Sequence, residues 1–196
     1  MQTKLVILDR DGTINADSDD YIKSADEWEP LPGALEAIAR LNHAGWHVVL
    51  ASNQSGLGRG LFDMAALNAM HAKLNKLLAA KGGRIDAIFF CPHSPDERCH
   101  CRKPLPGLFE QIAERYGMAL DGVNAVGDSL RDLIAAASAG CAPHLVLTGK
   151  AGGLSKPLQQ GEALPEGYPA TTRVHEDLMG FATWLLAHEA RGKAVV

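Results

Sequence analysis

Two carboxylates stand close together near the start of this chain, where a buried strand is predicted to end. Asp9 and Asp11 follow the apolar run Leu5–Leu8, within the sequence Asp-Arg-Asp-Gly-Thr. Side chains two residues apart leave a strand end on the same side, so one carboxylate could attack a phosphorus atom while the other handles the proton of the leaving group. Because Asp and Gly are also common turn residues, an ordinary turn stays open as the alternative.

A second polar group follows the next predicted strand. Ser52, Asn53, Gln54 and Ser55 come directly after the apolar run 47–51 and are followed by glycine. A small hydroxyl and backbone N–H groups at a strand end can bind phosphate oxygens. Taken alone, this segment is more typical of a polar loop.

Two cations and a third carboxylate lie further along the chain. Lys103 could offset the charge of a phosphoryl group and of an attacking carboxylate, and Arg102 could grip a phosphate or a sugar. The alternative is an exposed basic pair. Asp128 follows the apolar run 123–126 and could complete an oxygen site for Mg²⁺ or cap the next helix. We interpret Asp128 as a metal ligand, with Asp132 either supporting it or facing solvent.

Soft metal ligands cluster between positions 91 and 101. Cys91, His93, Cys99 and Cys101 offer three thiolates and one imidazole, a complete tetrahedral set of the kind found in structural zinc sites. Reduced thiols in a loop are the alternative. The neighbouring His100 alternates with the cysteines and is expected to point outward, and the distant Cys141 is expected to be a small buried residue. The zinc-binding loop, residues 91–103, would deliver Arg102 and Lys103 to a phosphate.

The elements that must position these residues alternate between strands and helices. Continuous apolar runs predict buried strands of a parallel sheet, at 5–8, 47–51, 85–90, 123–126 and 144–147. Amphipathic patterns predict helices at 33–44, 63–81, 106–116, 129–139 and 176–189. This order predicts an α/β three-layer sandwich with a central, mostly parallel sheet, formed by a single domain over residues 1–196. Residues 149–170 are predicted to form a long surface loop.

Composition narrows the classes of protein further. The chain has 196 residues, of which 46% are hydrophobic, and a formal net charge of -4. An acidic chain has no general affinity for nucleic acid or anionic membranes, and no apolar stretch approaches the roughly 20 residues of a membrane span. We therefore expect a cytoplasmic protein, where clustered cysteines indicate a metal rather than disulfides. Nothing in the sequence demands more than a monomer.

The four polar groups, taken in order, resemble the four motifs of the haloacid dehalogenase superfamily over residues 4–148. The resemblance implies a Rossmann-like core and a Mg²⁺-dependent phosphatase that works through an aspartyl-phosphate. Asp9 would be the nucleophile and Asp11 the acid and base, while Ser52 and Lys103 would stabilise the transferred group. Asp9, the backbone carbonyl of Asp11 and Asp128 would hold Mg²⁺.

The pattern Cys-Pro-His-x-Pro…Cys-x-Cys-Arg-Lys-Pro is similar to a zinc-loop subgroup of this superfamily. The subgroup contains phosphatases of a heptose bisphosphate, a precursor of nucleotide-activated heptose for bacterial surface polysaccharide, and histidinol phosphatases. Residues 52–60 and 127–132 favour the heptose substrate. The segment 17–21 departs from the heptose pattern, because it lacks the glycine expected before its tyrosine and is one residue longer, and the zinc loop is of the short type that histidinol phosphatases share. The residues expected to contact the sugar phosphate are Arg10, Asp17, Asp20, Tyr21, Asn53, Gln54, Ser55 and Arg102.

Several alternatives stay open at this point. Histidinol phosphate carries an amine, which Asp17, Asp19 and Asp20 could bind. A polynucleotide 3′-phosphatase has similar motifs, but the net charge argues against it. A non-catalytic zinc module would not need both Asp9 and Asp11. No large cap domain is expected, so residues 14–29 are the candidate cover, with Tyr21 and Trp28 as its apolar contacts.

Overall fold

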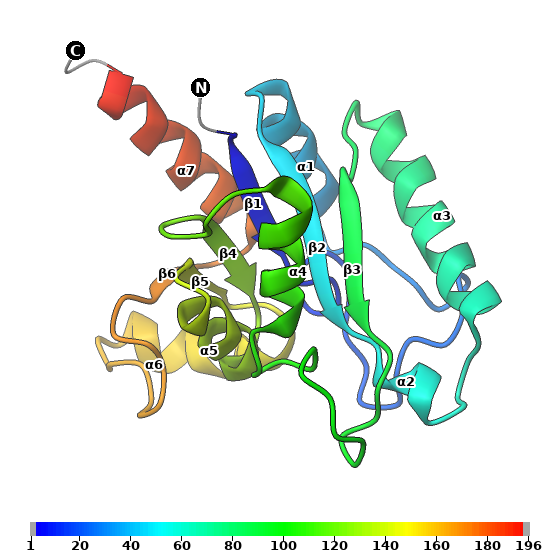
Figure 1. Ribbon diagram of the computed structural model, residues 1–196. Helices are drawn as coiled ribbons and strands as arrows, with labels where there is room; N and C mark the ends of the chain where they lie inside the picture. The colour runs from blue at the N-terminus through cyan, green and yellow to red at the C-terminus, as the bar shows by residue number, and fades with distance from the viewer. Residues whose placement is uncertain (1–2, 194–196) are drawn as a thin grey trace.

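The computed structural model describes residues 3–193 and contains one parallel sheet with helices on both faces (Figure 1). The sheet has six strands in the order β3-β2-β1-β4-β5-β6, and each neighbouring pair is parallel. The prediction of a three-layer α/β fold is thereby confirmed. The strands are β1 (Leu5–Leu8), β2 (His47–Asn53), β3 (Ala87–Cys91), β4 (Asn124–Gly127), β5 (Ala142–Val146) and β6 (Arg173–His175).

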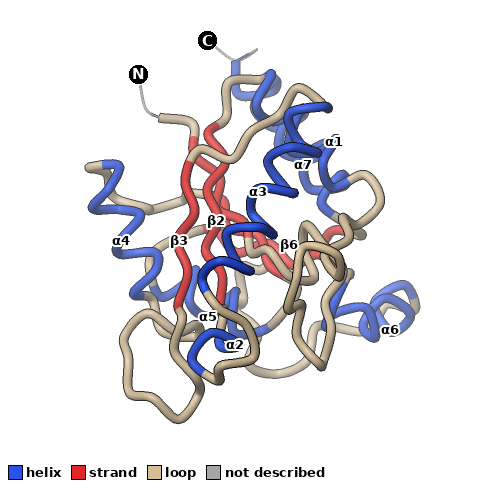
Figure 2. Tube along the Cα trace, turned by 90° about the vertical axis from the view of Figure 1, so that its right-hand side faces the viewer, coloured by secondary structure: helices blue, strands red, loops and turns tan. Residues whose placement is uncertain are grey.

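The longer helices divide between the two faces of the sheet. Figure 2 shows α4 (Gly107–Tyr116) on one side of the strands, and α1 (Ala34–His43), α3 (Met64–Ala80) and α7 (Leu178–Lys193) on the other. The fifth helix, α5 (Leu130–Ser138), packs on the same side as α4. Right-handed crossovers of this kind bring every strand's carboxyl end to one edge of the sheet.

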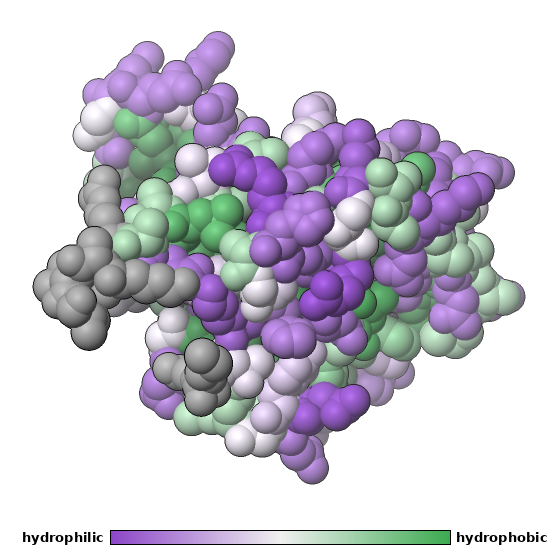
Figure 3. All heavy atoms as spheres, turned by 90° about the horizontal axis from the view of Figure 1, so that it is seen from above, coloured by the Kyte–Doolittle hydropathy of each residue, from purple (hydrophilic) through white to green (hydrophobic). Residues whose placement is uncertain are grey.

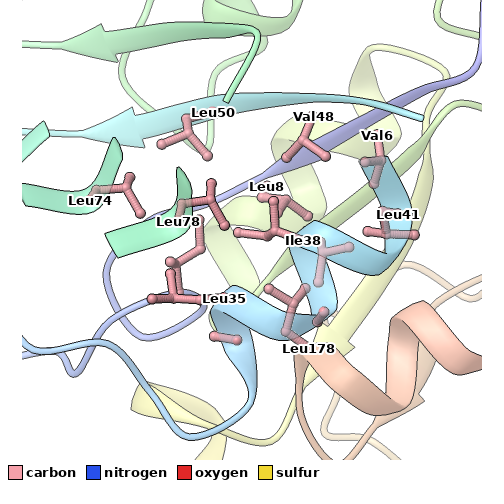
Figure 4. Packing of buried hydrophobic residues seen from close by; sticks show 14 of the residues in the cluster. Val6, Leu8, Leu35, Ile38, Leu41, Val48, Leu50, Leu74, Leu78 and Leu178 are labelled. Carbon is pink, nitrogen blue, oxygen red and sulfur yellow. The ribbon is translucent and has the colours of Figure 1, made fainter. Parts of the chain in front are cut away.

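Alternation along the strands produces two cores. Successive side chains of a strand point to opposite faces, so Val6 and Leu8 of β1 pack with α1, α3 and α7, whereas Leu5 and Ile7 pack with α4 and α5. Figure 4 shows the first core, where Ile38 lies between the strand residues and Leu178 of α7. Burial on both faces explains why the strands read as continuous apolar runs.

Several short helices and one short strand were not predicted from the sequence. The segment expected to be a long loop at 149–170 begins with a 3-10 helix, η1 (Gly149–Leu154), and α6 (Ser155–Gln159), so that prediction was wrong over its first half. The strand β6 and the short helix α2 (Ser55–Gly58) were also missed. Elements of one turn or three residues are too short to show a period, which is why pattern reasoning fails for them.

The segment 14–29 lies between β1 and α1, and its two aromatic residues have different roles. Tyr21 and Ile22 line a pocket at the carboxyl ends of the strands. Trp28 is fully buried among the core residues on the α1 side, so the prediction that it forms part of a cover over the site was wrong. Its large apolar surface is better buried in the core than exposed on a rim.

Figure 3 shows the face at the other end of the sheet as mostly hydrophilic with smaller apolar areas. Within the described part of the chain, no helix has the length and apolar character needed to cross a membrane.

Candidate active site

A buried ammonium group lies at the centre of the site. The side chain of Lys103 is only 2% exposed, and its Nζ lies 2.8 Å from Asp9 Oδ1 and 2.7 Å from Asp132 Oδ1, and donates to the carbonyl of Ala51 at 2.7 Å. Burial alone would lower the pKa of Lys103, but the carboxylates of Asp132 and Asp9 outweigh burial and raise the pKa. Lys103 is therefore a fixed cation beside Asp9.

Asp132 faces the site and not solvent. Its carboxylate accepts hydrogen bonds from the backbone N–H and the hydroxyl of Ser129, which forms a capping box at the start of α5. Burial would raise the pKa of Asp132, but Lys103 and these hydrogen bonds hold the pKa below its usual value. Of the two alternatives left by the sequence, the supporting role fits this geometry.

Carboxylates from two strand ends and from the first turn of α5 converge on one point. Oxygen atoms of Asp9, Asp128 and Asp132 all lie within 4.8 Å of one another. Burial, followed by the charges of neighbouring carboxylates, raises the pKa of Asp128 to about 8, and burial raises the pKa of Asp9 to about 7 in spite of Lys103. This unmet negative charge fits a hard divalent cation bound by oxygen ligands.

Two glycines allow this convergence. Gly12 has φ +81°, and a Cβ atom there would lie 2.2 Å from Asp128 Oδ2. Gly149, at φ +49°, meets the same oxygen at the same distance. The next backbone N–H, that of Lys150, donates to Asp128 Oδ2 at 2.7 Å. A side chain at either glycine would displace the Asp128 carboxylate.

Asp11 is surrounded by donors. Its oxygens accept from Nε and Nη2 of Arg10, both at 3.0 Å, and from the amides of Asn15 and Gln54, both at 2.9 Å. Burial favours the neutral acid, but Arg10 and these hydrogen bonds outweigh it and lower the pKa of Asp11. The carboxylate form therefore predominates in this arrangement.

The placement of Arg10 differs from its predicted role. Its side chain is 1% exposed, lies outside the pocket lining, and contacts Asp11, Gln54 and, at 3.4 Å, His71. Because the guanidinium is enclosed by protein groups, it positions Asp11 and does not face a substrate.

The polar segment after β2 supports the motif residues around it. Gln54 Nε2 donates to Ser52 Oγ at 2.7 Å as well as to Asp11, so it links two predicted catalytic groups. Asn53 binds the backbone of Lys103 twice, with both donor–acceptor distances at 3.0 Å. Asn53, Gln54 and Ser55 also line the pocket, whereas Ser52 is buried behind it.

The cysteine-rich loop brings its four predicted ligands together. The Sγ atoms of Cys91 and Cys99 are 3.8 Å apart, and His93 Nδ1 lies 3.5 Å from Cys91 Sγ and 3.3 Å from Cys101 Sγ. A tetrahedral metal with bonds of about 2.3 Å to sulfur and about 2.0 Å to nitrogen requires separations of roughly 3.8 and 3.5 Å. The spacing is too long for a disulfide and fits a shared metal ion.

The loop is connected directly to the cations of the site. The Arg102 side chain donates to the carbonyl of His93 at 3.4 Å, and the Arg102 backbone binds the thiol of Cys99. His100 points outward and pairs with Glu110 at 2.7 Å, and Cys141 is buried elsewhere in the core, as both were predicted. A metal here would fix the backbone that carries Arg102 and Lys103.

Several pocket residues were not singled out from the sequence. Asp17 and Tyr21 line the pocket as expected and Asp20 does not, and Asp19, named from the sequence only for an amine substrate, lines it too. The residues that the sequence analysis did not name are Ser18, Ile22, Phe62, Arg131 and Lys150. Lys150 follows β5 by four residues, so the rule that ligands bind at the carboxyl ends of strands was the available signal. Arg131 lies in the first turn of α5, and the others come from loops, where sequence gives no comparable signal.

A scan of family models matches residues 3–140 to the haloacid dehalogenase-like hydrolases. A protein of Bordetella bronchiseptica, named D-glycero-beta-D-manno-heptose-1,7-bisphosphate 7-phosphatase, is 62% identical over 183 residues, which are 93% of this chain and 98% of that protein. A Pseudomonas aeruginosa protein of the same name is 53% identical over 95% of this chain and 99% of its own length.

Solved structures agree with this similarity. The crystal structure of the D,D-heptose 1.7-bisphosphate phosphatase from B. bronchiseptica, complexed with magnesium and phosphate, has a TM-score of 0.87 at 60% identity and covers 95% of this chain and 99% of that one. A D,D-heptose 1,7-bisphosphate phosphatase from Burkholderia thailandensis has a TM-score of 0.68 at 52% identity, over 94% of this chain and 99% of that one.

The carboxylate cluster predicts pH-dependent cation binding. We expect Mg²⁺ to bind more tightly as the pH rises from about 6 to about 9, because binding needs the carboxylate forms of Asp9 and Asp128, whose pKa values are about 7 and about 8. Below those values protons compete with the cation, so the affinity falls by up to about tenfold per pH unit for each protonated group. Calorimetric titration in buffers of different ionisation enthalpy measures both the affinity and the protons released.

One variant tests this prediction and a second serves as its control. Asp128→Asn removes a ligand and should abolish the pH-dependent binding, whereas Asp121→Asn changes an exposed carboxylate outside the cluster and should leave it intact. An affinity that stays constant over the whole pH range would contradict the assigned ligands.

Proposed function

Because this chain belongs to the haloacid dehalogenase-like hydrolase family, we propose that it is a Mg²⁺-dependent phosphatase that removes the 7-phosphate of D-glycero-beta-D-manno-heptose 1,7-bisphosphate. The product would be heptose 1-phosphate, a precursor of nucleotide-activated heptose. One observation supports phosphoryl transfer as the type of reaction. Lys103 contacts both Asp9 and Asp132, and these carboxylates lie beside Asp128 where the strands end. The substrate is supported by the relatives of the same name.

The first half of the reaction belongs to Asp9. A carboxylate oxygen of Asp9 forms a bond to phosphorus as the bond between phosphorus and the sugar oxygen breaks, giving an aspartyl-phosphate. Asp11 donates a proton to the departing sugar oxygen. In the second half a water molecule attacks phosphorus, Asp11 takes the proton of that water, and inorganic phosphate leaves as Asp9 is restored.

The environment of Asp11 suits its two tasks in different ways. Its lowered pKa favours the carboxylate that deprotonates water in the second half. For the first half it must carry a proton, and the negative charge of an arriving phosphate raises the pKa of a neighbouring carboxyl group. Arg10 and Gln54 hold the carboxylate in place for both steps.

The remaining residues stabilise charge. Lys103 would neutralise oxygens of the transferred group while holding Asp9, and Ser52 would donate its hydroxyl to another oxygen. Mg²⁺, bound by Asp9, Asp128 and the backbone carbonyl of Asp11, would lower the repulsion between the anionic nucleophile and the anionic phosphate.

The pocket is lined by charges of both signs. Four cations, Arg102, Lys103, Arg131 and Lys150, line it together with the carboxylates of Asp9, Asp11, Asp17, Asp19 and Asp132. Of the three carboxylates that could bind the amine of histidinol phosphate, Asp17 and Asp19 are already paired with Lys150, whose Nζ lies 2.8 Å and 3.3 Å from them, and Asp20 does not line the pocket. Histidinol phosphate is therefore the weaker candidate.

The proposal includes a structural zinc ion held by Cys91, His93, Cys99 and Cys101. Four protein ligands leave no open position for a substrate, so the metal acts on the geometry of Arg102 and Lys103. A cytoplasmic location, a monomeric state and the lack of affinity for nucleic acid or membranes remain predictions from the sequence.

The test of substrate and mechanism is phosphate release, with Mg²⁺, from heptose bisphosphate and histidinol phosphate in parallel. We expect kcat/KM for the bisphosphate to be higher by about a hundredfold or more, which corresponds to roughly 2.7 kcal/mol of differential transition-state binding. Asp9→Asn should release no phosphate from either substrate while it keeps the far-ultraviolet circular dichroism of the wild type.

Other outcomes separate the parts of the proposal. A preference for histidinol phosphate would overturn the substrate and leave the mechanism intact. Phosphate release by Asp9→Asn within a few-fold of the wild type would exclude Asp9 as the nucleophile.

If the zinc-binding loop holds a metal, losing one ligand should lower the zinc content, the stability and the activity together. Cys99→Ser should lower the zinc content and the melting temperature together, and should lower kcat, because the loop carries Lys103. Elemental analysis, calorimetry and turnover measure the three effects. Cys141→Ser is the matched control, since Cys141 lies outside the cluster and its substitution should leave the zinc content unchanged. Full zinc occupancy in Cys99→Ser would show that Cys99 is not a ligand.

A further inference from the structure

The loop after β5 reaches across the pocket mouth to an acidic segment. We call residues 17–21, with the sequence Asp-Ser-Asp-Asp-Tyr, the acidic strap. Lys150 Nζ lies 2.8 Å from Asp17 Oδ2 and 3.3 Å from Asp19 Oδ1, and all three residues line the pocket. One ammonium group is therefore shared by two of the three carboxylates of the strap.

The two carboxylates differ in how strongly they act on the pocket. Asp19 is fully exposed, so water and salt screen its charge. The side chain of Asp17 is only 20% exposed, and its charge already raises the pKa of Asp128, after the larger effects of burial and of Asp9 and Asp132. The pair between Lys150 and Asp17 therefore decides the charge that a leaving group meets.

The backbone fixes where the ammonium group of Lys150 lies. Thr148 Oγ1 donates to the carbonyl of Gly12 at 2.6 Å, Gly149 lies against Gly12, and the Lys150 N–H donates to Asp128. These contacts place the Lys150 backbone beside the catalytic carboxylates, whatever side chain it carries. The ammonium group can thus be removed without removing the hydrogen bond to Asp128.

We propose that Lys150 determines specificity for the charge of the leaving group in the reaction proposed above. By pairing with Asp17, Lys150 removes the repulsion that an anionic leaving group would meet and denies Asp17 to a cationic one. Because Lys150 and Asp17 both line the pocket, the pair acts where a leaving group would lie, and its effect is expected in substrate choice.

Four phosphomonoesters, three single variants and one double variant test this inference. The esters are heptose bisphosphate, a propanediol bisphosphate, nitrophenyl phosphate as the ester with an uncharged leaving group, and phosphoethanolamine as the cationic one. The variants are Lys150→Met, Lys150→Arg and the control Lys156→Met, which removes an exposed cation of α6 outside the pocket lining.

We expect Lys150→Met to lower kcat/KM for both bisphosphates by about tenfold or more relative to nitrophenyl phosphate, because two like charges then face one another. The kcat/KM for phosphoethanolamine, relative to that for nitrophenyl phosphate, should rise. Lys150→Arg should restore the wild-type ratios, and Lys156→Met should not change them. Adding Asp17→Asn to Lys150→Met should recover turnover of the bisphosphates.

Three results would overturn the inference: equal losses for all four esters, unchanged ratios in Lys150→Met, or no recovery on adding Asp17→Asn. Because these readouts compare variants with the wild type, they are independent of the wild-type ranking of substrates. Failure of the heptose assignment would show in that ranking, while the propanediol bisphosphate still reports on Lys150.

Discussion

The site depends on one electrostatic constraint: carboxylates from two strand ends and a helix start are held within contact of one another in a buried place. Asp9, Asp128 and Asp132 would repel one another if nothing intervened, and burial makes the repulsion larger because little water screens it. Lys103 compensates for part of this charge, but burial and then the neighbouring carboxylates still raise the pKa values of Asp9 and Asp128. A site with this residual charge attracts a cation and, through the cation, a phosphate.

Much of the surrounding structure serves to hold Lys103 in place. A lysine has a long, flexible side chain, so its position has to be fixed by its backbone and by its contacts. Asn53 binds the Lys103 backbone on one side, and the cysteine-rich loop restrains the residue before it. The capping box of Ser129 and Asp132 fixes the carboxylate that receives the ammonium group. A metal held by the cysteine-rich loop would thereby be connected to the nucleophile through a few residues.

Sequence reasoning succeeded where the chemistry is local to a strand end. Asp9, Asp128 and the four soft ligands sit in short motifs whose spacing predicts their place, and the apolar strands between them predict the sheet. Arg10 was misplaced because its neighbour Asp11 and the distant Gln54 enclose it, and adjacency in a motif does not reveal which side chain turns inward. Lys150 was missed because its partner Asp17 lies far away in the sequence, and a pair of exposed charges leaves no pattern along the chain.

Without an inserted cap domain, this arrangement separates chemistry from recognition. Groups that make and break bonds are buried on strand ends and depend on many mutual contacts, so substitutions there disturb several partners at once. Other groups of the pocket lining, such as Asp17, Tyr21 and Lys150, lie outside the strands and have few partners. Changes in these loop residues can alter the charge and shape presented to the substrate while the nucleophile keeps its environment. A small set of exposed charges is therefore sufficient to distinguish an anionic sugar phosphate from a cationic amino alcohol phosphate on the same catalytic scaffold.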